Sequence, residues 1–276
     1  MLRGLTRKIR QAYRTYGPTV GRQRKNLTGT PDEWAGSWRT AEKSAIKGKS
    51  HNAEALLLSL FFIINSHRAE DMRNKAEALK TLVTCAKLYR SNLCNQNLIF
   101  IFSDTNHLIR YFESVFLANN FLHLTGVKLT NNNMDAKTFY NACLNNRLGL
   151  KDFNLSADGV SDLKLSILPY LMQIHKNARM AGDYTNDNIK LRTEKLVGNT
   201  RGCIGFVSGC NDYYIPNTLL KEDIRDKIKH PMRVLATYSK YIHAPFYSQN
   251  YYIAKNFMLE TLYAYDNLKD KIIAST

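Results

Sequence analysis

The segment Phe121–Val127 contains the residues whose types and spacing could do proton chemistry. A histidine and a threonine, His123 and Thr125, interrupt a run of apolar residues that ends near a glycine. If this segment is a strand, side chains alternate between its faces, so the imidazole and the hydroxyl share one face. An imidazole beside a hydroxyl can act as an acid or a base near neutral pH. The alternative is a core histidine that is satisfied by a backbone carbonyl.

The motifs of several common chemistries are absent from the sequence. It contains no Walker phosphate loop, no dinucleotide-binding glycine motif after a strand, no HExxH, no calcium loop and no GxSxG. Five cysteines without a CxxC spacing or a histidine cluster indicate free thiols in a reducing compartment and no zinc site. We therefore expect no metal and no cofactor, and a reaction carried by His, Lys, Arg, Thr and Tyr side chains.

Cleavage of RNA by its own 2′-hydroxyl is one such reaction. It needs a base near the 2′-hydroxyl, an acid near the leaving 5′-oxygen and cations beside the charged phosphorane. Lys164 lies in a leucine-rich helical segment, and Lys240 ends a β-like run. Arg192 precedes Thr193 in another such run, and Arg201 follows a Gly-Asn-Thr turn. Taken singly, each cation is more often a surface group that extends into solvent or pairs with an acid.

The net charge of +16 is unevenly distributed. Residues 1–50 carry 12 Lys and Arg against 3 acids, whereas residues 51–276 carry 27 against 20. A basic chain indicates a polyanionic partner, most often nucleic acid, with an anionic membrane surface as the competitor. For the first 50 residues the alternative is a solvated, charge-rich tail. No apolar run is long enough for a membrane span and no secretory signal is evident, so we expect a cytoplasmic protein.

Hydrophobic periodicity predicts N-terminal helices followed by a run of strands. This order favours an α+β fold with a curved antiparallel sheet and additional helices. We expect a basic, loosely ordered arm over 1–50, an apolar helical extension over 51–75 and the α+β domain over 76–276. The predicted helices are 52–65, 69–89 (after a polar break at 66–68), 135–146, 161–181, 221–229 and 257–268. The predicted strands are 97–103, 108–117, 121–128, 190–197, 204–208, 213–216, 233–240 and 250–256.

Several motifs follow one another between about residues 76 and 256. None is distinctive alone, but their ordered combination is more specific than any one of them. They are Phe121-Leu122-His123-Leu124-Thr125-Gly126, then Phe139, Leu148 and Asp152-Phe153, then Lys164, Lys190–Gly198, Tyr214–Asp223, and finally Val234-Leu235-Ala236 with Lys240.

In these motifs the chain resembles the phage-associated barnase–EndoU–colicin–RelE-like nucleases, and among them the fourth subgroup. The resemblance implies metal-independent ribonuclease activity and an origin in a phage or a bacterial mobile element. Residues 1–75 fall outside it. The catalytic positions that it implies are His123, Lys164, Thr193 and Lys240. The substrate-binding positions that we expect are Thr125, Arg192, Arg201, Tyr214, Asn217 and Thr218.

The sequence therefore predicts an endoribonuclease that acts in the cytoplasm of a bacterial host, with RNA as its partner and DNA as the second candidate. A different hypothesis is an inactive nuclease-like protein that grips nucleic acid or a host factor through its basic arm. This alternative gains support because neither His175 nor His243 is obviously paired with His123. A third hypothesis is a toxin that an inhibitory protein partner restrains.

Overall fold

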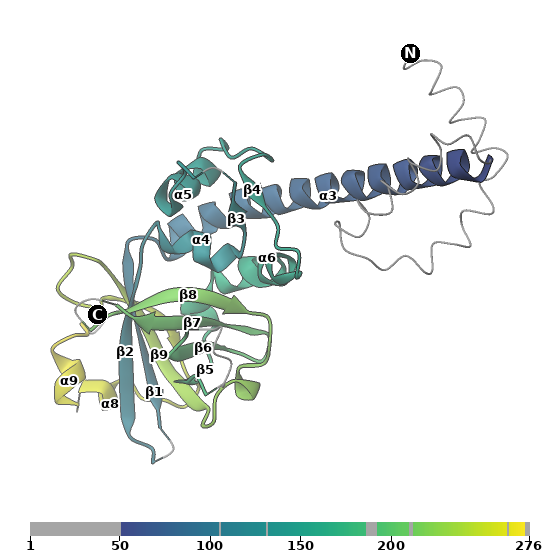
Figure 1. Cartoon of the computed structure of the whole chain (residues 1–276). Coiled ribbons are helices and arrows are strands. Elements are labelled where there is room, and N and C mark those ends of the chain that lie inside the picture. Colours follow the sequence, from purple (N-terminus) through teal and green to yellow (C-terminus); the bar gives the residue numbers. More distant parts are fainter. Residues whose placement is uncertain are drawn as a thin grey trace. The chain divides into compact units, whose positions relative to one another are not determined.

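The computed structural model describes residues 51–104, 106–130, 132–185, 192–209, 212–263 and 265–273, and its side chains from residue 71 onward except those of residues 73 and 263 (Figure 1). The predicted basic arm over 1–50 lies outside these residues. Contacts within the chain divide it into two compact units, 1–74 and 75–276. The second unit contains the sheet and the predicted site residues.

Helix α3 spans His51–Asn92 without interruption, so the predicted break at 66–68 is wrong. The three residues there are polar but include neither glycine nor proline, and other residues cost a helix only a few tenths of a kcal/mol each. In the second unit one face of α3 is buried at helical spacing. Its members are Ala78, Leu82, Cys85, Ala86 and Tyr89.

Eight of the described strands form one strongly curved, mostly antiparallel sheet (Figure 1). Strand β1 pairs with β2 on one side and with β9 on the other, so the order β1-β2-β8-β7-β6-β5-β9 returns to its start. The contact between β2 and β8 is parallel, at Ser114 and Tyr214. The predicted α+β class with a curved antiparallel sheet is confirmed. The strands are β1 Gln96–Ser103, β2 Ile109–Phe116, β5 Met180–Asp183, β6 Lys195–Asn199, β7 Gly202–Ser208, β8 Tyr214–Leu220, β9 Met232–Tyr241 and β10 Gln249–Ile253.

The remaining elements are short. A small two-stranded sheet is formed by β3 and β4, and the helices lie between the strands of the main sheet or after them. These elements are α4 Asn120–Thr125, β3 Lys128–Leu129, α5 Ala136–Leu144, β4 Phe153–Asn154, α6 Val160–Leu171, α7 Ile174–Asn177, the 3-10 turn η2 Ile224–Asp226, α8 Glu260–Tyr263 and α9 Asp266–Lys269.

The predicted strand at 121–128 is wrong, because most of it is helix α4. Phe121 and Leu124 lie three positions apart and are both buried, which is the spacing of one helix face rather than of alternation. The Asn120 side chain accepts a hydrogen bond from the Leu117 backbone N–H at 2.7 Å and fixes the entry to the helix. Gly126 ends the helix in the left-handed conformation, with φ of 71°.

Three other predicted helices are shorter than expected. The segment 161–181 holds α6, then α7, and then the start of strand β5. The segment 221–229 contains only the 3-10 turn η2, and 257–268 contains α8 and the start of α9. The helical pattern past residue 171 is misleading because this part of the chain lies beside the sheet, and β5 there pairs with both β6 and β9.

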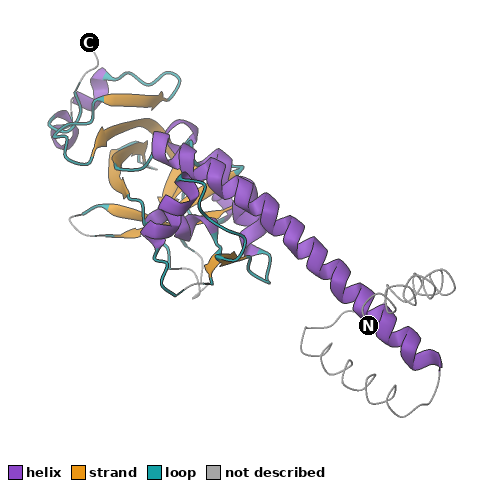
Figure 2. Ribbon diagram, turned by 90° about the horizontal axis from the view of Figure 1, so that it is seen from above, coloured by secondary structure: helices purple, strands orange, loops and turns teal. Residues whose placement is uncertain are grey.

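The sheet is packed on both faces. Along β1 the side chains alternate, so that Leu98 and Phe100 join one core while Ile99 and Ile101 join another. The first core is the larger, and it includes residues of α3, α4, α5 and α6. The second lies under the C-terminal segment, with Leu262 among its members. Figure 2 shows the C-terminal helices set apart from the others.

Candidate active site

His123 lies near the end of α4 with its side chain exposed. Because Phe121 and Leu124 occupy the buried face of this helix, the imidazole is directed away from the core. The ring makes no hydrogen bond or ion pair to the described residues. An imidazole that is exposed and held on a short, well-packed helix is available to a substrate as an acid or a base.

Lys164 reaches the same place from α6. Its Nζ donates a hydrogen bond to the backbone carbonyl oxygen of His123 at 3.3 Å. The stem of this side chain lies against Gly126, where a Cβ atom would stand 2.8 Å from the Lys164 Cδ. Burial lowers the pKa of Lys164. The glycine that ends α4 therefore also leaves the room that the lysine needs.

Hydrogen bonds fix the junction of α4 and α6. The Ser161 hydroxyl donates to the Gly126 carbonyl oxygen at 2.8 Å and so ties the two helices together. Thr125 is fully buried; its hydroxyl donates to the Leu122 carbonyl oxygen at 2.7 Å and accepts from the Val127 backbone N–H at 3.3 Å. The Thr125 hydroxyl is therefore occupied within the turn, where it positions the loop beside His123.

A second group of predicted residues gathers around β8. The Thr193 hydroxyl donates to Asn217 Oδ1 at 3.2 Å, and Asn217 Nδ2 donates to the Arg192 carbonyl oxygen. Asn217 is the extra residue at an irregularity in the pairing of β7 with β8, next to Gly205. The buried Thr218 packs its methyl group over that glycine. The threonine, the asparagine and the Arg192 backbone thus form one connected polar cluster.

Strand β8 connects the two groups. Both α4 and α6 pack against β8, and they also pack against each other. Lys164 and the neighbouring His123 backbone therefore belong to the same local assembly as the strand that carries Asn217. The side chains of the two groups nevertheless lie on different faces of the sheet: Thr193 and Thr218 meet Gly205 on the Cys203 side of β7, whereas α6 packs with Ile204 and Phe206 in the larger core.

Three other predicted residues are held by contacts of their own. Lys240 is on β9, where its Nζ lies 4.8 Å from the centroid of the Tyr247 ring and 3.4 Å from the Pro245 carbonyl oxygen. Tyr247 belongs to the second core, whereas α6 contributes to the first, so the sheet separates Lys240 from Lys164. The structure therefore does not bring these two cations to one phosphate.

Arg201 and Tyr214 are also held by local contacts. The Arg201 guanidinium lies 4.3 Å from the centroid of the Tyr170 ring, at the turn between β6 and β7. The Tyr214 ring packs edge-on against Phe112 with centroids 5.2 Å apart. Its ring also receives the ammonium group of Lys195 at 5.8 Å. Both contacts of the Tyr214 ring are therefore made within the protein, one to the core and one to Lys195.

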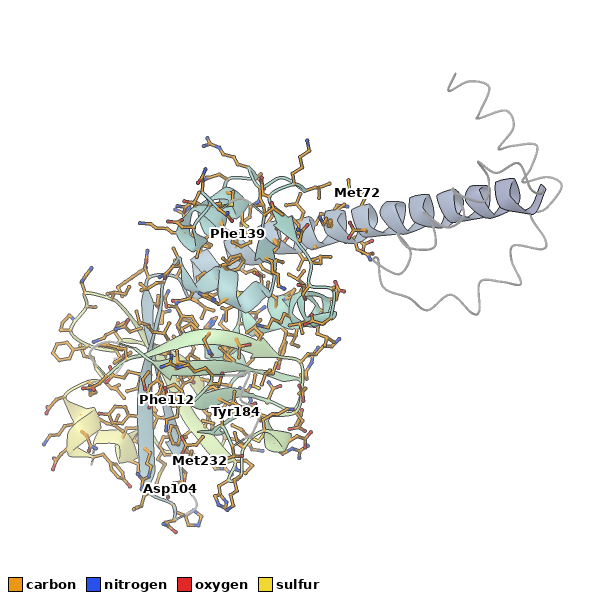
Figure 3. The ribbon with its side chains drawn as sticks, in the orientation of Figure 1. Met72, Asp104, Phe112, Phe139, Tyr184 and Met232 are labelled. Carbon is orange, nitrogen blue, oxygen red and sulfur yellow. The ribbon has the colours of Figure 1, made fainter. Side chains whose placement is uncertain are left out.

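Sequence reasoning missed a cavity of about 820 Å³ at the end of the sheet where the β1–β2 hairpin turns. Asp104 and Met232, which both line it, lie at the end of the sheet away from Phe139 (Figure 3). Four of its charged groups form two ion pairs, Arg110 with Asp104 at 2.8 Å and Lys195 with Asp183 at 2.5 Å, and Lys229 also lines it. Nothing in the sequence signals this cavity, because it forms only when β1, β2, β5, β6 and β9 meet.

Among the described residues no three His, Cys, Asp or Glu side chains gather as metal ligands would. Within the same residues, no helix is both long enough and apolar enough to cross a bilayer.

The curved sheet and the helices packed on its larger core define an α+β protein whose candidate site carries a histidine and a lysine on adjoining helices. Residues 81–256, more than half of the chain, match the family described as phage-Barnase-EndoU-ColicinE5/D-RelE like nuclease4, and the chain belongs to this family. The resemblance drawn from the sequence motifs is thereby confirmed. Comparisons with curated proteins and with solved structures gave no match.

Proposed function

We propose that this protein is a metal-independent endoribonuclease of a phage or bacterial mobile element, which cleaves RNA through attack by the 2′-hydroxyl. The observation that supports this most is the contact between α4 and α6. There an exposed imidazole stands on the residue whose carbonyl oxygen accepts a hydrogen bond from Lys164, inside the segment that belongs to a nuclease family. The excess of positive charge suits a polyanionic substrate.

The proposed roles follow from the chemistry of each group. His123 takes the proton from the 2′-hydroxyl as that oxygen attacks the phosphorus atom. The bond between phosphorus and the 5′-oxygen then breaks, and the leaving oxygen accepts a proton from the Lys164 ammonium group. Burial lowers the pKa of this lysine and makes it a better acid than a solvated one. The products are a 2′,3′-cyclic phosphate and a 5′-hydroxyl.

The polar cluster on β8 supplies the remaining contacts in this proposal. The single hydroxyl hydrogen of Thr193, which is donated to Asn217 Oδ1 at 3.2 Å, turns in this proposal to a flanking phosphate oxygen of the bound RNA. The Arg192 side chain, which is exposed, adds positive charge. Lys240 has no role in this step because it lies across the sheet.

A second candidate function is binding without cleavage. The position of Lys240 favours it, since one of the cations predicted to stabilise the phosphorane is not near Lys164. In that case the protein grips nucleic acid or a host protein, and Lys164 serves only to hold α4 against α6. Under either function the proposed place of action is the cytoplasm of the bacterial host, and the toxin hypothesis adds an inhibitory protein partner.

One experiment separates the two functions. The purified full-length protein is incubated in excess EDTA with RNA, with single-stranded DNA and with 2′-O-methyl RNA of the same sequence. Endoribonuclease activity predicts cleavage of RNA alone, with 2′,3′-cyclic phosphate ends on the products. Cleavage of DNA or of 2′-O-methyl RNA would exclude attack by the 2′-hydroxyl. Binding to all three polymers without any cleavage would favour the second function.

A further inference from the structure

Three cationic side chains lie over tyrosine rings along one connected surface. Arg201 covers Tyr170 at 4.3 Å, Lys176 lies 5.9 Å from the centroid of the Tyr251 ring, and Arg179 covers Tyr252 at 4.1 Å. We call these six residues the cation–aromatic strip. They come from α6, from α7 and the residues just after it, from the β6–β7 turn and from β10.

Hydrogen bonds make the strip continuous. The Asn199 side chain donates to the Tyr170 hydroxyl at 2.6 Å and to the Asn177 carbonyl oxygen at 2.9 Å, which joins the β6–β7 turn to α6 and α7. Helix α7 in turn packs against β10, the strand that carries Tyr251 and Tyr252. The strip is therefore a surface fixed by the fold rather than a set of unrelated side chains.

The cations of the strip keep hydrogen-bond donors that no described residue uses. Arg179 uses only Nη1, which donates hydrogen bonds to the Lys176 and Ala178 carbonyl oxygens at 2.7 and 2.8 Å. The side chains of Arg201 and Lys176 have no hydrogen bond to the described residues, and all three cations are exposed. Their stacking on tyrosine fixes the groups in place while the donors remain directed to solvent.

Two other lysines that lie over tyrosine rings are paired with acids, whereas Lys240, over Tyr247, has no acidic partner among the described residues. Lys195, which lies over Tyr214, is paired with Asp183, and Lys271, which lies over Tyr111, is paired with Glu113. No carboxylate among the described residues pairs with a cation of the strip. If these three cations have an anionic partner, it comes from outside the described residues.

The sequence around the strip carries positive charge without any acid. The segments 163–182, 195–207 and 227–259 contain 3, 2 and 5 Lys and Arg respectively, and none contains Asp or Glu. Of these ten cations, Lys195 and Lys227 are paired with Asp183 and Glu222, and Lys240 lies over Tyr247 of the second core, which leaves seven, three of them in the strip. This part of the protein has the charge of a polyanion-binding surface independently of the N-terminal arm.

We infer that the cation–aromatic strip binds single-stranded RNA. The guanidinium and ammonium groups contact phosphates, and the flat faces of Arg201 and Arg179 take unstacked bases, as planar cations and aromatic rings do in single-strand recognition. Lys164 and Tyr170 lie six residues apart on α6, about 9 Å along its axis. That this bound strand is also the substrate rests on the proposed function, whereas the binding itself does not.

The test compares two triple variants of the full-length protein. In the strip variant, Lys176→Gln, Arg179→Gln and Arg201→Gln remove three charges. In the control variant, Lys137→Gln, Arg147→Gln and Lys151→Gln remove three charges from exposed residues in and after α5. Fluorescence anisotropy with a labelled 2′-O-methyl oligonucleotide measures affinity from 50 to 300 mM salt, and this probe resists attack by a 2′-hydroxyl. Thermal unfolding confirms that both variants are folded.

We expect the strip variant to bind about tenfold to a hundredfold more weakly than the wild type at 100 mM salt. Its slope of log affinity against log salt should be smaller by about 2, since each phosphate contact on a single strand contributes about 0.7. The control should bind within about threefold of the wild type. Equal weakening of both variants, or no weakening of either, would overturn the inference. Selective loss of binding to anionic vesicles, with RNA affinity intact, would also overturn it.

The outcome is independent of catalysis. If the strip variant loses RNA binding while the wild type cleaves no RNA, the strip is established and the proposed ribonuclease fails. If the wild type cleaves RNA and the strip variant binds normally, the ribonuclease stands and this inference fails.

Discussion

The ammonium group of Lys164 lies 3.3 Å from the backbone carbonyl oxygen of His123. A cation at the C-terminal end of a short helix suits the partial negative charge of the last carbonyl groups. The same hydrogen bond sets the separation of the two helices that carry the candidate acid and base. Substitutions at this contact can therefore distinguish a structural lysine from a catalytic one.

Replacing His123 by Ala should lower the rate of RNA cleavage by about two to four orders of magnitude, the usual loss for an acid or base. Because the side chain is exposed, the free energy of unfolding should change by less than about 0.5 kcal/mol. His243→Ala, at another exposed histidine, is the matched control and should keep wild-type activity. Full activity in His123→Ala would remove His123 from the mechanism.

Lys164→Met should reduce activity by about a hundredfold or more while leaving the protein equally or more stable. Burial lowers the pKa of Lys164 below 10.5, so the folded protein disfavours the charged form. This loss of folding stability is fully present below the pKa of Lys164 in the folded protein, and it disappears as the pH rises above 10.5. Cleavage rates and urea midpoints at pH 7 and above pH 10 check this. A loss of stability that parallels the loss of activity would show that the lysine is structural.

Gly126→Ala and Gly159→Ala form a matched pair. Both glycines have positive φ, 71° and 75°, so alanine at either should cost about 1–2 kcal/mol of stability. A Cβ at Gly159 meets no atom within 4 Å, whereas at Gly126 it meets the flexible Lys164 stem. We expect similar losses of stability but a selective loss of activity in Gly126→Ala. Equal activities would show that the lysine need not lie on this glycine.

The stability of the protein should fall in mild acid because of His175. This side chain is 1% exposed, and its Nδ1 finds no hydrogen-bond partner among the described residues. Burial, aided by the charge of Lys176, lowers the pKa of His175 from 6.5 to about 4. Between these values the unfolded chain binds the extra proton, so stability is present above pH 6.5 and is lost as the pH falls toward 4.

For that difference in pKa, the histidine accounts for a loss of about 2 kcal/mol between pH 7 and pH 5. Urea unfolding of the wild type and of His175→Gln at both pH values measures it. The gap in unfolding free energy between the two proteins should narrow by this amount at pH 5. Parallel changes in both proteins would show that His175 is not the group responsible.

The sequence predicts the strands best where alternation is strict and the segment is long. Strand β1 is expected over 97–103 and found at Gln96–Ser103, and its alternate residues enter two different cores. The segment around His123 is misread because Phe-Leu-His-Leu-Thr satisfies both alternation and one helical turn. The hydrogen bond from Leu117 N–H to the Asn120 side chain, just before the helix, and the left-handed Gly126 that ends it decide between them.

The candidate site is less predictable than the fold. The approach of Lys164 to His123 depends on two helices separated along the chain by β3, α5 and β4, and no spacing in the sequence reports it. The resemblance to the nuclease family predicts that His123 and Lys164 share a site, but it cannot show that Lys240 lies across the sheet. That separation is set by the register of β9 against β1, where Lys240 pairs with Asn97.

The double pairing of β1 has a consequence for synthesis of the chain. Its second neighbour, β9, begins at Met232, long after β1 has left the ribosome. Until then one side of a highly apolar strand is unsatisfied and can recruit another molecule instead. Premature termination before that point should therefore yield insoluble fragments, because β1 gains its second neighbour only after β9 has been made.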